Sequence, residues 1–202
     1  MKSNFSTKLL GKFYLKVCKK GLKEKGISKQ TIKDIKDEYN MVIERAKDIG
    51  KAQLLSSYLM GGYFIAMNRK SGLTADENYE ILLNGLMSSK LFHKIMGNSK
   101  SYFNPKRTEK RKIWANKSHL KKYENDWVVD ILDGNDQYDL GYDYTQCGIC
   151  KLFKDEGCFE LAHYMCQMDY PMADMIGIKL KRTKTLANGD NVCDFRYSKL
   201  DK

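Results

Sequence analysis

The segment that decides the fold is Lys181-Arg-Thr-Lys-Thr185-Leu-Ala-Asn-Gly189-Asp-Asn-Val-Cys193-Asp-Phe-Arg-Tyr197. Two runs that contain β-branched and aromatic residues flank the pair Asn188-Gly189 within it. Asn-Gly is the strongest short-range signal for a β-hairpin, because both central residues of the tight turn need a positive φ. The sequence therefore predicts two strands joined by a turn at Asn188-Gly189.

This hairpin is unusually rich in reactive side chains. Along its second run, strand alternation places Asp194 and Arg196 on one face and Cys193 on the other. Arg182 lies on the first run, but the register across the turn is open, so the sequence leaves undecided which faces coincide. A guanidinium group here suits either a substrate carboxylate or a structural ion pair with Asp194.

Two further strands are expected upstream, over residues 127–132 and 138–145, around a turn at 133–136. In the second of them, tyrosines and a leucine alternate with polar or small residues, which is typical of a strand with one face on a core. A helical region is expected from about residue 148 to 176, with breaks at Gly157 and at Tyr170-Pro171. Gly177 is well placed to end it.

The first half of the chain has the pattern of helices. Apolar residues recur with helical spacing over 5–17, as Phe5, Leu9, Phe13 and Val17, and again over 32–49. A packed amphipathic helix is a commoner outcome for such a stripe than a membrane-surface helix. A third helix is expected over 52–68, weakened by an internal Gly-Gly pair, and residues 106–122 suit either a helix or a long basic connection.

A capping box formed by Thr74 and Glu77 predicts the start of a fourth helix. The order of the elements is helices, hairpin, helix and hairpin, which predicts an α+β fold with a small antiparallel sheet. We expect one domain over residues 1–202. Its mainly helical part would cover 1–122 and its α+β part 123–202.

The composition is that of a globular protein, with 42% hydrophobic and 30% charged residues. No apolar run approaches the ~20 residues that a transmembrane helix needs. Lysines at positions 8, 12 and 16 interrupt any signal-peptide core, so a cytoplasmic location is expected. The six cysteines are then expected to be thiols, ligands or nucleophiles rather than disulfides.

The net charge of +11 is concentrated over residues 2–25 and 106–122, each with eight basic residues and one acidic residue. Such runs suit phosphates or an acidic membrane surface, but a solvated lysine-rich face is the commoner explanation. No helix-turn-helix, zinc-finger or RNA-binding signature accompanies them. We therefore expect an anionic small-molecule substrate, no nucleic-acid partner and no integral membrane association. A homo-oligomer is compatible with the sequence.

Two groups of residues suggest chemistry. Cys147-Gly-Ile-Cys150 has the spacing of half a zinc or redox site, but a second tight pair and a thioredoxin-like context are both missing, so no metal is expected. Neighbouring members of the set His163, Cys166 and Asp169 share one side of a helix, and a thiol near a base and a carboxylate suits nucleophilic catalysis. A helix with a buried cysteine and a surface histidine is the commoner structural alternative.

Residues 182–197 resemble the C-terminal signature of the L-2-amino-thiazoline-4-carboxylic acid hydrolase family. The resemblance extends upstream through Asp126-Trp127, residues 139–147 and Cys166-Gln-Met-Asp169. Over the N-terminal helices it is limited to the kind and order of the elements. It implies a cofactor-free hydrolase that acts on a carbon–nitrogen or carbon–sulfur bond. The named reaction opens 2-amino-2-thiazoline-4-carboxylate to N-carbamoyl-L-cysteine, a step of cysteine metabolism.

The resemblance also implies a site. The catalytic candidates are Cys166, Asp169, Cys193 and Asp194, and the candidates for binding the substrate carboxylate are Arg182 and Arg196. Either a thiol attacks the ring carbon between sulfur and nitrogen, or an aspartate activates water for that attack.

Two features depart from this family pattern. Cys150, Cys158 and the lysine-rich segments are not part of it. The end of the chain also resembles small-molecule-binding domains of the 4-vinyl-reductase type. A ligand-binding sensor or adaptor without turnover is therefore the alternative function.

Overall fold

The computed structural model describes residues 5–50 and 52–200. The helices before the first strand are α1 (Phe5–Glu24), α2 (Lys29–Arg45), α3 (Leu55–Lys70), α4 (Ala75–Met87), α5 (Lys90–Met96), α6 (Ser99–Tyr102) and α7 (Pro105–Ser118). The rest of the chain forms β1 (Val128–Asp133), β2 (Leu140–Gln146), α8 (Gly148–Asp155), the 3-10 turn η1 (Phe159–Leu161), α9 (Ala162–Gln167), α10 (Asp169–Met175), β3 (Ile178–Lys181), the 3-10 turn η2 (Leu186–Asn188) and β4 (Cys193–Lys199). The α+β class predicted from the sequence is confirmed.

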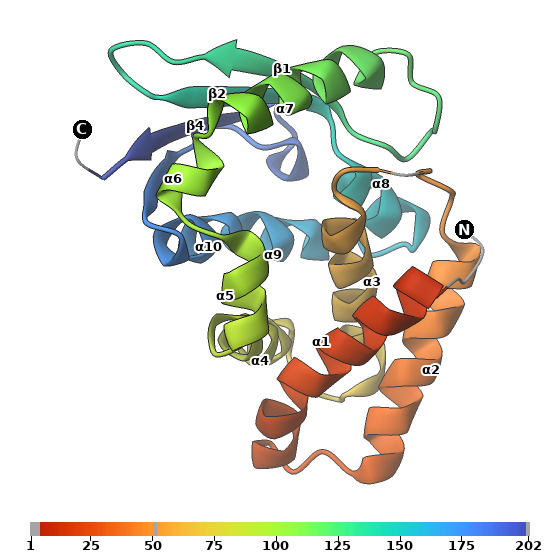
Figure 1. Ribbon diagram of the computed structural model, residues 1–202. Helices are drawn as coiled ribbons and strands as arrows, with labels where there is room; N and C mark the ends of the chain where they lie inside the picture. The colour runs from red at the N-terminus through yellow and green to blue at the C-terminus, as the bar shows by residue number, and fades with distance from the viewer. Residues whose placement is uncertain (1–4, 51, 201–202) are drawn as a thin grey trace.

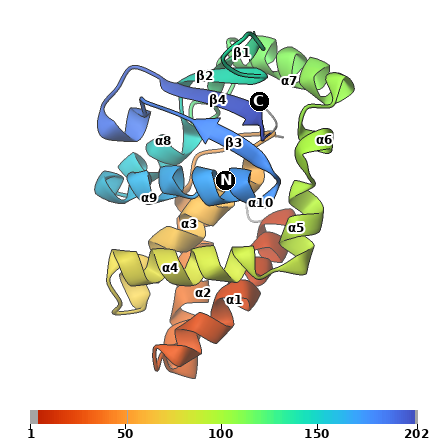
Figure 2. The same cartoon turned by 90° about the vertical axis from the view of Figure 1, so that its left-hand side faces the viewer.

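One antiparallel sheet, with strand order β1-β2-β4-β3, forms one end of the molecule, and α1, α2 and α4 lie at the other end (Figure 1). The helices α9 and α10 lie beneath the sheet, between it and α4 (Figure 2). The register pairs Tyr142 with Phe195 and Tyr144 with Cys193, so the aromatic residues of β2 and the apolar residues of β4 share one face. This inner face packs on helices, whereas the opposite face is polar.

The connection between β3 and β4 differs from the tight turn expected at Asn188-Gly189. Strand β3 ends at Lys181, and residues 182–192 form a longer loop that contains η2. Only Gly189 of the pair has a positive φ, of 90°, because Asn188 belongs to the 3-10 turn. The side chain of Thr185 accepts a hydrogen bond from Asn188 N (3.2 Å) and caps η2. The hairpin pairing is confirmed, and the predicted turn type is wrong.

The helical half follows the predicted order, with differences in detail. The Thr74–Glu77 capping box is present at the start of α4. Residues 105–118 form a helix, α7, rather than a basic connection. The helical break expected at Tyr170-Pro171 falls earlier, at Met168, because Pro171 lies in the first turn of α10, where its missing N–H would have no intrahelical partner.

Helix α1 buries a different stripe from the one expected. Tyr14, Cys18 and Leu22 face the core, whereas Leu9 of the predicted stripe is largely exposed. Phe5 of that stripe has a side chain outside the described part of the structure. Phe13 and Val17 of the predicted stripe are partly buried against the core, so helix α1 is packed as predicted. No helix in the described residues is long and apolar enough to cross a membrane.

The Gly61-Gly62 pair permits close packing of α3 rather than weakening it. A Cβ atom on Gly62 would lie 2.9 Å from the Ile43 side chain of α2, and one on Gly61 would lie 3.0 Å from Phe153 of α8. Both glycines are buried in the middle of α3. The absence of side chains lets the backbone of α3 approach two neighbouring helices at once.

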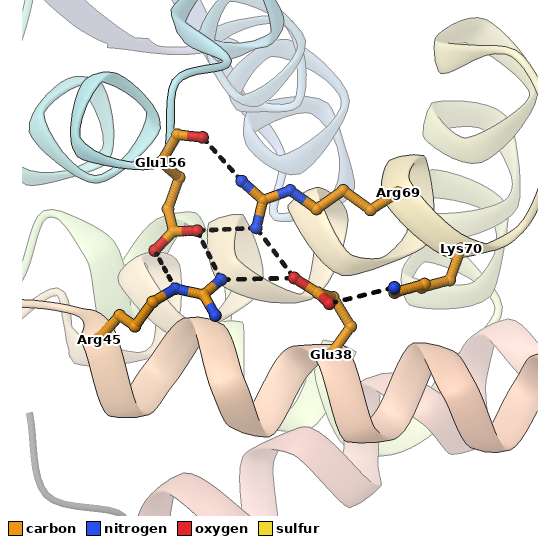
Figure 3. Close-up of polar contacts among 5 residues, drawn as sticks. All are labelled: Glu38, Arg45, Arg69, Lys70 and Glu156. Atoms are coloured by element: carbon orange, nitrogen blue, oxygen red, sulfur yellow. Dashed lines mark hydrogen bonds and ion pairs between the residues drawn. The ribbon is translucent and has the colours of Figure 1, made fainter.

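Five charged residues form ion pairs that link α2 and α3 to the turn after α8 (Figure 3). We call Glu38, Arg45, Arg69, Lys70 and Glu156 the interhelix ion cluster. Arg69 Nη1 contacts Glu38 Oε1 at 2.9 Å and Glu156 Oε2 at 2.7 Å, and the two glutamate side chains are only 7% and 6% exposed. Burial alone would raise the pKa of each glutamate, but hydrogen bonds from Arg69 and Arg45 outweigh it, so both pKa values are lowered.

Candidate functional site

A cavity of about 360 Å³ lies against the inner face of the sheet. Its lining combines side chains from the start of α3, from α7, from the strands and from α8–α10. Four of the predicted or suspected reactive residues meet there: Cys147, Cys166, Asp169 and Cys193. They come from four places in the chain, namely the residue before α8, α9, the start of α10 and β4. We call this space the thiol cavity.

The walls of the thiol cavity are mainly aromatic. Tyr142 and Tyr144 stack with their ring centroids 6.0 Å apart, and Phe195 meets Tyr144 edge-on at 5.4 Å. Tyr197 of β4 packs on Tyr102 of α6 at 5.1 Å. These side chains point inward because strand alternation puts every second residue of β2 and β4 on the same face. An aromatic site of this size suits a small ligand held by a few polar groups.

Asp169 supplies a carboxylate to the thiol cavity and is held by Arg182. Arg182 Nη1 donates to Asp169 Oδ2 at 2.6 Å, and Arg182 Nη2 donates to the carbonyl oxygen of Cys166 at 2.8 Å. Burial raises the pKa of Asp169 to about 6, although the Arg182 charge and hydrogen bond oppose the rise. The Asp169 side chain remains 32% exposed, whereas that of Arg182 is 4% exposed.

The Arg182 guanidinium group packs against two aromatic rings. Its guanidinium carbon lies 4.6 Å from the Phe195 ring centroid and 5.2 Å from that of Tyr170. It does not belong to the described lining of the thiol cavity. The geometry therefore makes Arg182 a positioning residue for Asp169, and its contact with a substrate carboxylate stays a prediction.

The three thiols of the cavity are held in their protonated form. Burial raises the pKa of Cys193 to about 11, although Leu186 N–H donates to its sulfur at 3.1 Å. Burial, followed by the neighbouring Cys147 and Asp169, raises the pKa of Cys166 far above its ordinary value. A hydrogen bond with Cys150, together with burial, does the same for Cys147. None of the three is an activated thiolate near neutral pH.

Asp194 lies on the outer face of β4 and organises the loop before it. Its carboxylate accepts hydrogen bonds from Thr183 N at 2.9 Å, Thr183 Oγ1 at 2.6 Å and Lys184 N at 2.6 Å. Burial would raise its pKa, but these hydrogen bonds outweigh burial and lower it. Asp194 is absent from the described lining of the thiol cavity. Strand alternation accounts for this placement, since Cys193 and Phe195 face inward.

Arg196 shares the outer face with Asp194, as the alternation predicted. Its Nη1 forms an ion pair with Asp143 Oδ1 at 2.7 Å, across the β2–β4 pairing, and its guanidinium carbon lies 5.3 Å from the Tyr138 ring centroid. It does not line the described part of the thiol cavity. The structural ion pair of Arg196 is therefore with Asp143 of β2 and not with Asp194, the partner suggested by the sequence.

The set His163, Cys166 and Asp169 is only partly brought together. His163 Nδ1 contacts the carbonyl oxygen of Glu160 at 2.6 Å, and its ring packs on Tyr164. Only Cys166 and Asp169 of the three line the thiol cavity. Within residues 5–50 and 52–200, no cluster of three or more histidine, cysteine, aspartate or glutamate side chains has the geometry to hold a metal ion.

Sequence reasoning missed two cavity residues on α7. Arg111 donates from Nη1 to the Tyr102 carbonyl oxygen at 2.7 Å, and its guanidinium carbon lies 4.4 Å from the Tyr102 ring centroid. Trp114, one turn further, has a buried Nε1 with no hydrogen-bond partner among the described residues. Both line the thiol cavity, where Arg111 is the one cation in the described lining. Their i, i+3 spacing in a basic segment was the available signal.

Comparison with known proteins gives one family. The family model described as L-2-amino-thiazoline-4-carboxylic acid hydrolase matches residues 5–197. No curated protein and no solved structure gives a significant match to the chain. The match spans the helical half as well as the sheet, so it includes every residue of the thiol cavity. It supports a hydrolase-type role, and the chain belongs to the L-2-amino-thiazoline-4-carboxylic acid hydrolase family.

Proposed function

We propose that this protein hydrolyses a small cyclic isothiourea carboxylate of the 2-amino-2-thiazoline-4-carboxylate type, with N-carbamoyl-L-cysteine as the product of the named compound. The observation that carries the proposal is the Asp169 carboxylate, which reaches an aromatic cavity, has a pKa of about 6 and is held by the nearly buried Arg182. The family match supports the reaction class.

Asp169 is a better candidate for the base than any cysteine is for the nucleophile. At pH 7, a carboxyl group of pKa about 6 is about 90% ionised. A thiol of pKa about 11, as at Cys193, is ionised in roughly one molecule in 10,000. A base with a pKa just below neutral also matches the value that general-base catalysis favours. Of the two routes left open by the sequence, activation of water is therefore the one we propose.

The proposed reaction balances with water alone. Asp169 accepts a proton from water as the oxygen bonds to the ring carbon between sulfur and nitrogen. The carbon–nitrogen double bond becomes a single bond and the ring nitrogen takes up a proton. The carbon–sulfur bond then breaks, the new oxygen becomes a carbonyl oxygen and the sulfur leaves as a thiol. The two protons of water finish on nitrogen and sulfur, and Asp169 is regenerated.

Arg111 is the proposed partner of the substrate carboxylate. It carries the cation in the described lining of the thiol cavity, and among residues 5–50 and 52–200 its one hydrogen bond to protein is from Nη1. The remaining guanidinium N–H groups are free to bind a carboxylate, for which a planar fork is well suited. We propose Arg111 in place of Arg182 and Arg196, which pair through Nη1 with Asp169 and Asp143 and do not line the described part of the thiol cavity.

The test is thiol release from 2-amino-2-thiazoline-4-carboxylate by the purified protein, with the product identified by mass and with a parallel reaction containing chelator. We expect N-carbamoylcysteine at the same rate with and without chelator. Cys166→Ala should still release thiol, whereas release by Asp169→Asn should be at least about 100-fold slower. Loss of release in Cys166→Ala with retention in Asp169→Asn would overturn the assigned base. Saturable binding without product would favour the sensor function instead.

A further inference from the structure

A second, larger cavity adjoins the thiol cavity. Its volume is about 560 Å³, and it shares Tyr102, Asp169 and Tyr197 with the thiol cavity. Its other walls come from α1, α3, α5, α10 and β3. We call it the apolar cavity. A ligand that reaches Asp169 from the thiol cavity therefore has this space directly beyond the carboxylate.

The walls of the apolar cavity are almost free of charge. Asp169 is the one charged residue in its described lining, and the rest are mostly aliphatic, methionine or phenylalanine side chains. Tyr14, one of its few polar residues, already donates its hydroxyl to the Ser56 carbonyl oxygen at 2.8 Å. Polar groups for a ligand are thus concentrated at the wall shared with the thiol cavity.

Large apolar side chains remain in water around the apolar cavity. Leu9 of α1 and Leu91 and Ile95 of α5 belong to its lining and are 55%, 54% and 66% exposed. Leu9 is the largely exposed member of the apolar stripe predicted for α1. A contiguous exposed apolar surface around a concave site is typical of a place where an apolar group binds.

The two cavities are too large for the named ring alone. A ring with an amino and a carboxylate substituent takes roughly the space of five waters, or about 150 Å³ at ~30 Å³ each. The thiol cavity holds about 360 Å³ and the apolar cavity about 560 Å³. With the carboxylate at Arg111 and the reacting carbon at Asp169, the exocyclic amino group on that carbon lies on the far side of the ring from the carboxylate. It is thus the substituent nearest to the apolar cavity.

We infer that the substrate is an N-substituted cyclic isothiourea carboxylate, whose exocyclic nitrogen carries an alkyl or aryl group that binds in the apolar cavity. The inference rests on the proposed function and narrows its substrate class. The apolar group supplies binding through its transfer from water, and the polar ring provides orientation at Asp169 and Arg111.

The test uses two matched series of ligands. In the first, 2-(alkylamino)imidazoline-4-carboxylates with methyl to hexyl chains replace the ring sulfur by nitrogen, so that no thiolate can leave, and calorimetry measures their affinity. We expect the affinity to rise about threefold to fourfold per methylene, as transfer of a methylene from water predicts. An affinity that is flat or falls with chain length would overturn the inference.

Variants at the exposed edge of the apolar cavity (rim variants) test where the alkyl chain of the ligand binds. Leu91→Asn combined with Ile95→Asn places uncharged polar groups at exposed positions, so the fold and the charge are preserved, and we expect it to flatten the dependence on chain length. Leu120→Asn changes an exposed leucine outside both cavities and should leave the dependence intact. The inference would be overturned if affinity did not depend on alkyl-chain length and the double variant dissociated a dimer. The exposed apolar surface would then bind a second copy of the protein.

The second series, the corresponding thiazolines, separates this inference from the proposed function. Thiol release reports hydrolysis and depends on Asp169, whereas the imidazoline affinities do not require turnover. If affinity rises with the length of the alkyl chain but no thiazoline is hydrolysed, the proposed function fails, while the inference that the apolar cavity binds the alkyl group stands. If the parent thiazoline is hydrolysed and longer chains neither bind nor react better, the inference fails while the proposed function stands.

Discussion

The interhelix ion cluster and the Asp169–Arg182 pair both hold carboxylates against arginines, yet the pKa values of these carboxylates move in opposite directions. Glu38 and Glu156 share Arg45 and Arg69, whose hydrogen bonds outweigh burial, and Lys70 adds a third cation beside Glu38. Asp169 has Arg182 as its cation, and burial wins, which raises its pKa to about 6. A surplus of cations keeps a carboxylate ionised and structural, whereas a single cation beside an aromatic cavity leaves a carboxylate that exchanges protons near neutral pH.

The largest effect is expected for Asp169→Asn. The amide cannot accept a proton from water, so kcat should fall by about 100-fold to 10,000-fold, the usual contribution of a general base. Glu38→Gln in the ion cluster is the matched control and should leave kcat unchanged, since Glu38 lines neither cavity. Rates of thiol release for the two purified variants decide the matter. A comparable loss in both variants would mean that Asp169, like Glu38, is structural.

Arg111→Met should come next. Without its guanidinium group, the substrate carboxylate loses charge-assisted hydrogen bonds, so KM should rise about 10-fold to 100-fold while kcat changes less. Arg107→Met, on the exposed side of the same helix, is the control for the general loss of positive charge. Steady-state kinetics on both variants provide the measurement. An unchanged KM in Arg111→Met would show that the substrate carboxylate does not bind at this wall of the cavity.

In the ion cluster, the expected effect is on stability. Arg69→Met removes contacts to both glutamates and leaves them nearly buried with fewer cations, so the free energy of unfolding should fall by about 2 kcal/mol. Lys70→Met removes one longer contact, 3.5 Å from Lys70 Nζ to Glu38 Oε2, and should cost less than about 1 kcal/mol. Denaturant unfolding measures both changes, and neither variant should alter kcat. Equal losses would show that Arg69 has no bridging role.

The smallest expected effect concerns the free energy of unfolding: the contributions of Asp169 and Glu38 to it should depend on pH with opposite signs. The folded pKa of Asp169 lies above its unfolded value of 3.8, so its contribution to stability should diminish as pH rises from about 4 to 6. The folded pKa of Glu38 lies below its unfolded value of 4.5, so its contribution is present above that pH and is lost on acidification. Unfolding free energies from pH 3.5 to 7 for wild type, Asp169→Asn and Glu38→Gln measure both. Slopes of the same sign would refute the contrast.

Local patterns predicted much of the fold. Alternation in residues 138–145 and 193–197 sorted the strand faces correctly, so that Cys193 faces the cavity while Asp194 and Arg196 do not. The Asn188-Gly189 signal was misleading because Thr185, Asp190 and Asp194 offer oxygen acceptors to the loop backbone, and these stabilise a longer connection. Such competition among nearby polar side chains is not visible in a dipeptide signal.

Contacts between distant segments could not be predicted from the sequence. Glu38 and Glu156 meet although 118 positions separate them, and Arg111 reaches a cavity built mainly by residues 142–197. A single sequence gives the residue types and the period of each element, but the packing of helices on one face of a sheet decides which charges meet. The family resemblance placed Cys166, Asp169 and Cys193 near a pocket, whereas Cys147 was noted only for its spacing from Cys150.

The most direct test of Asp169 as the base is the pH dependence of kcat/KM for thiol release, measured in parallel for wild type and Asp169→Asn. We expect a limb that rises to a plateau above an apparent pKa of about 6 in the wild type and is absent from the residual activity of the variant. A limb above about pH 8.5, as an attacking thiol would give, or the same limb in both proteins, would contradict the assignment.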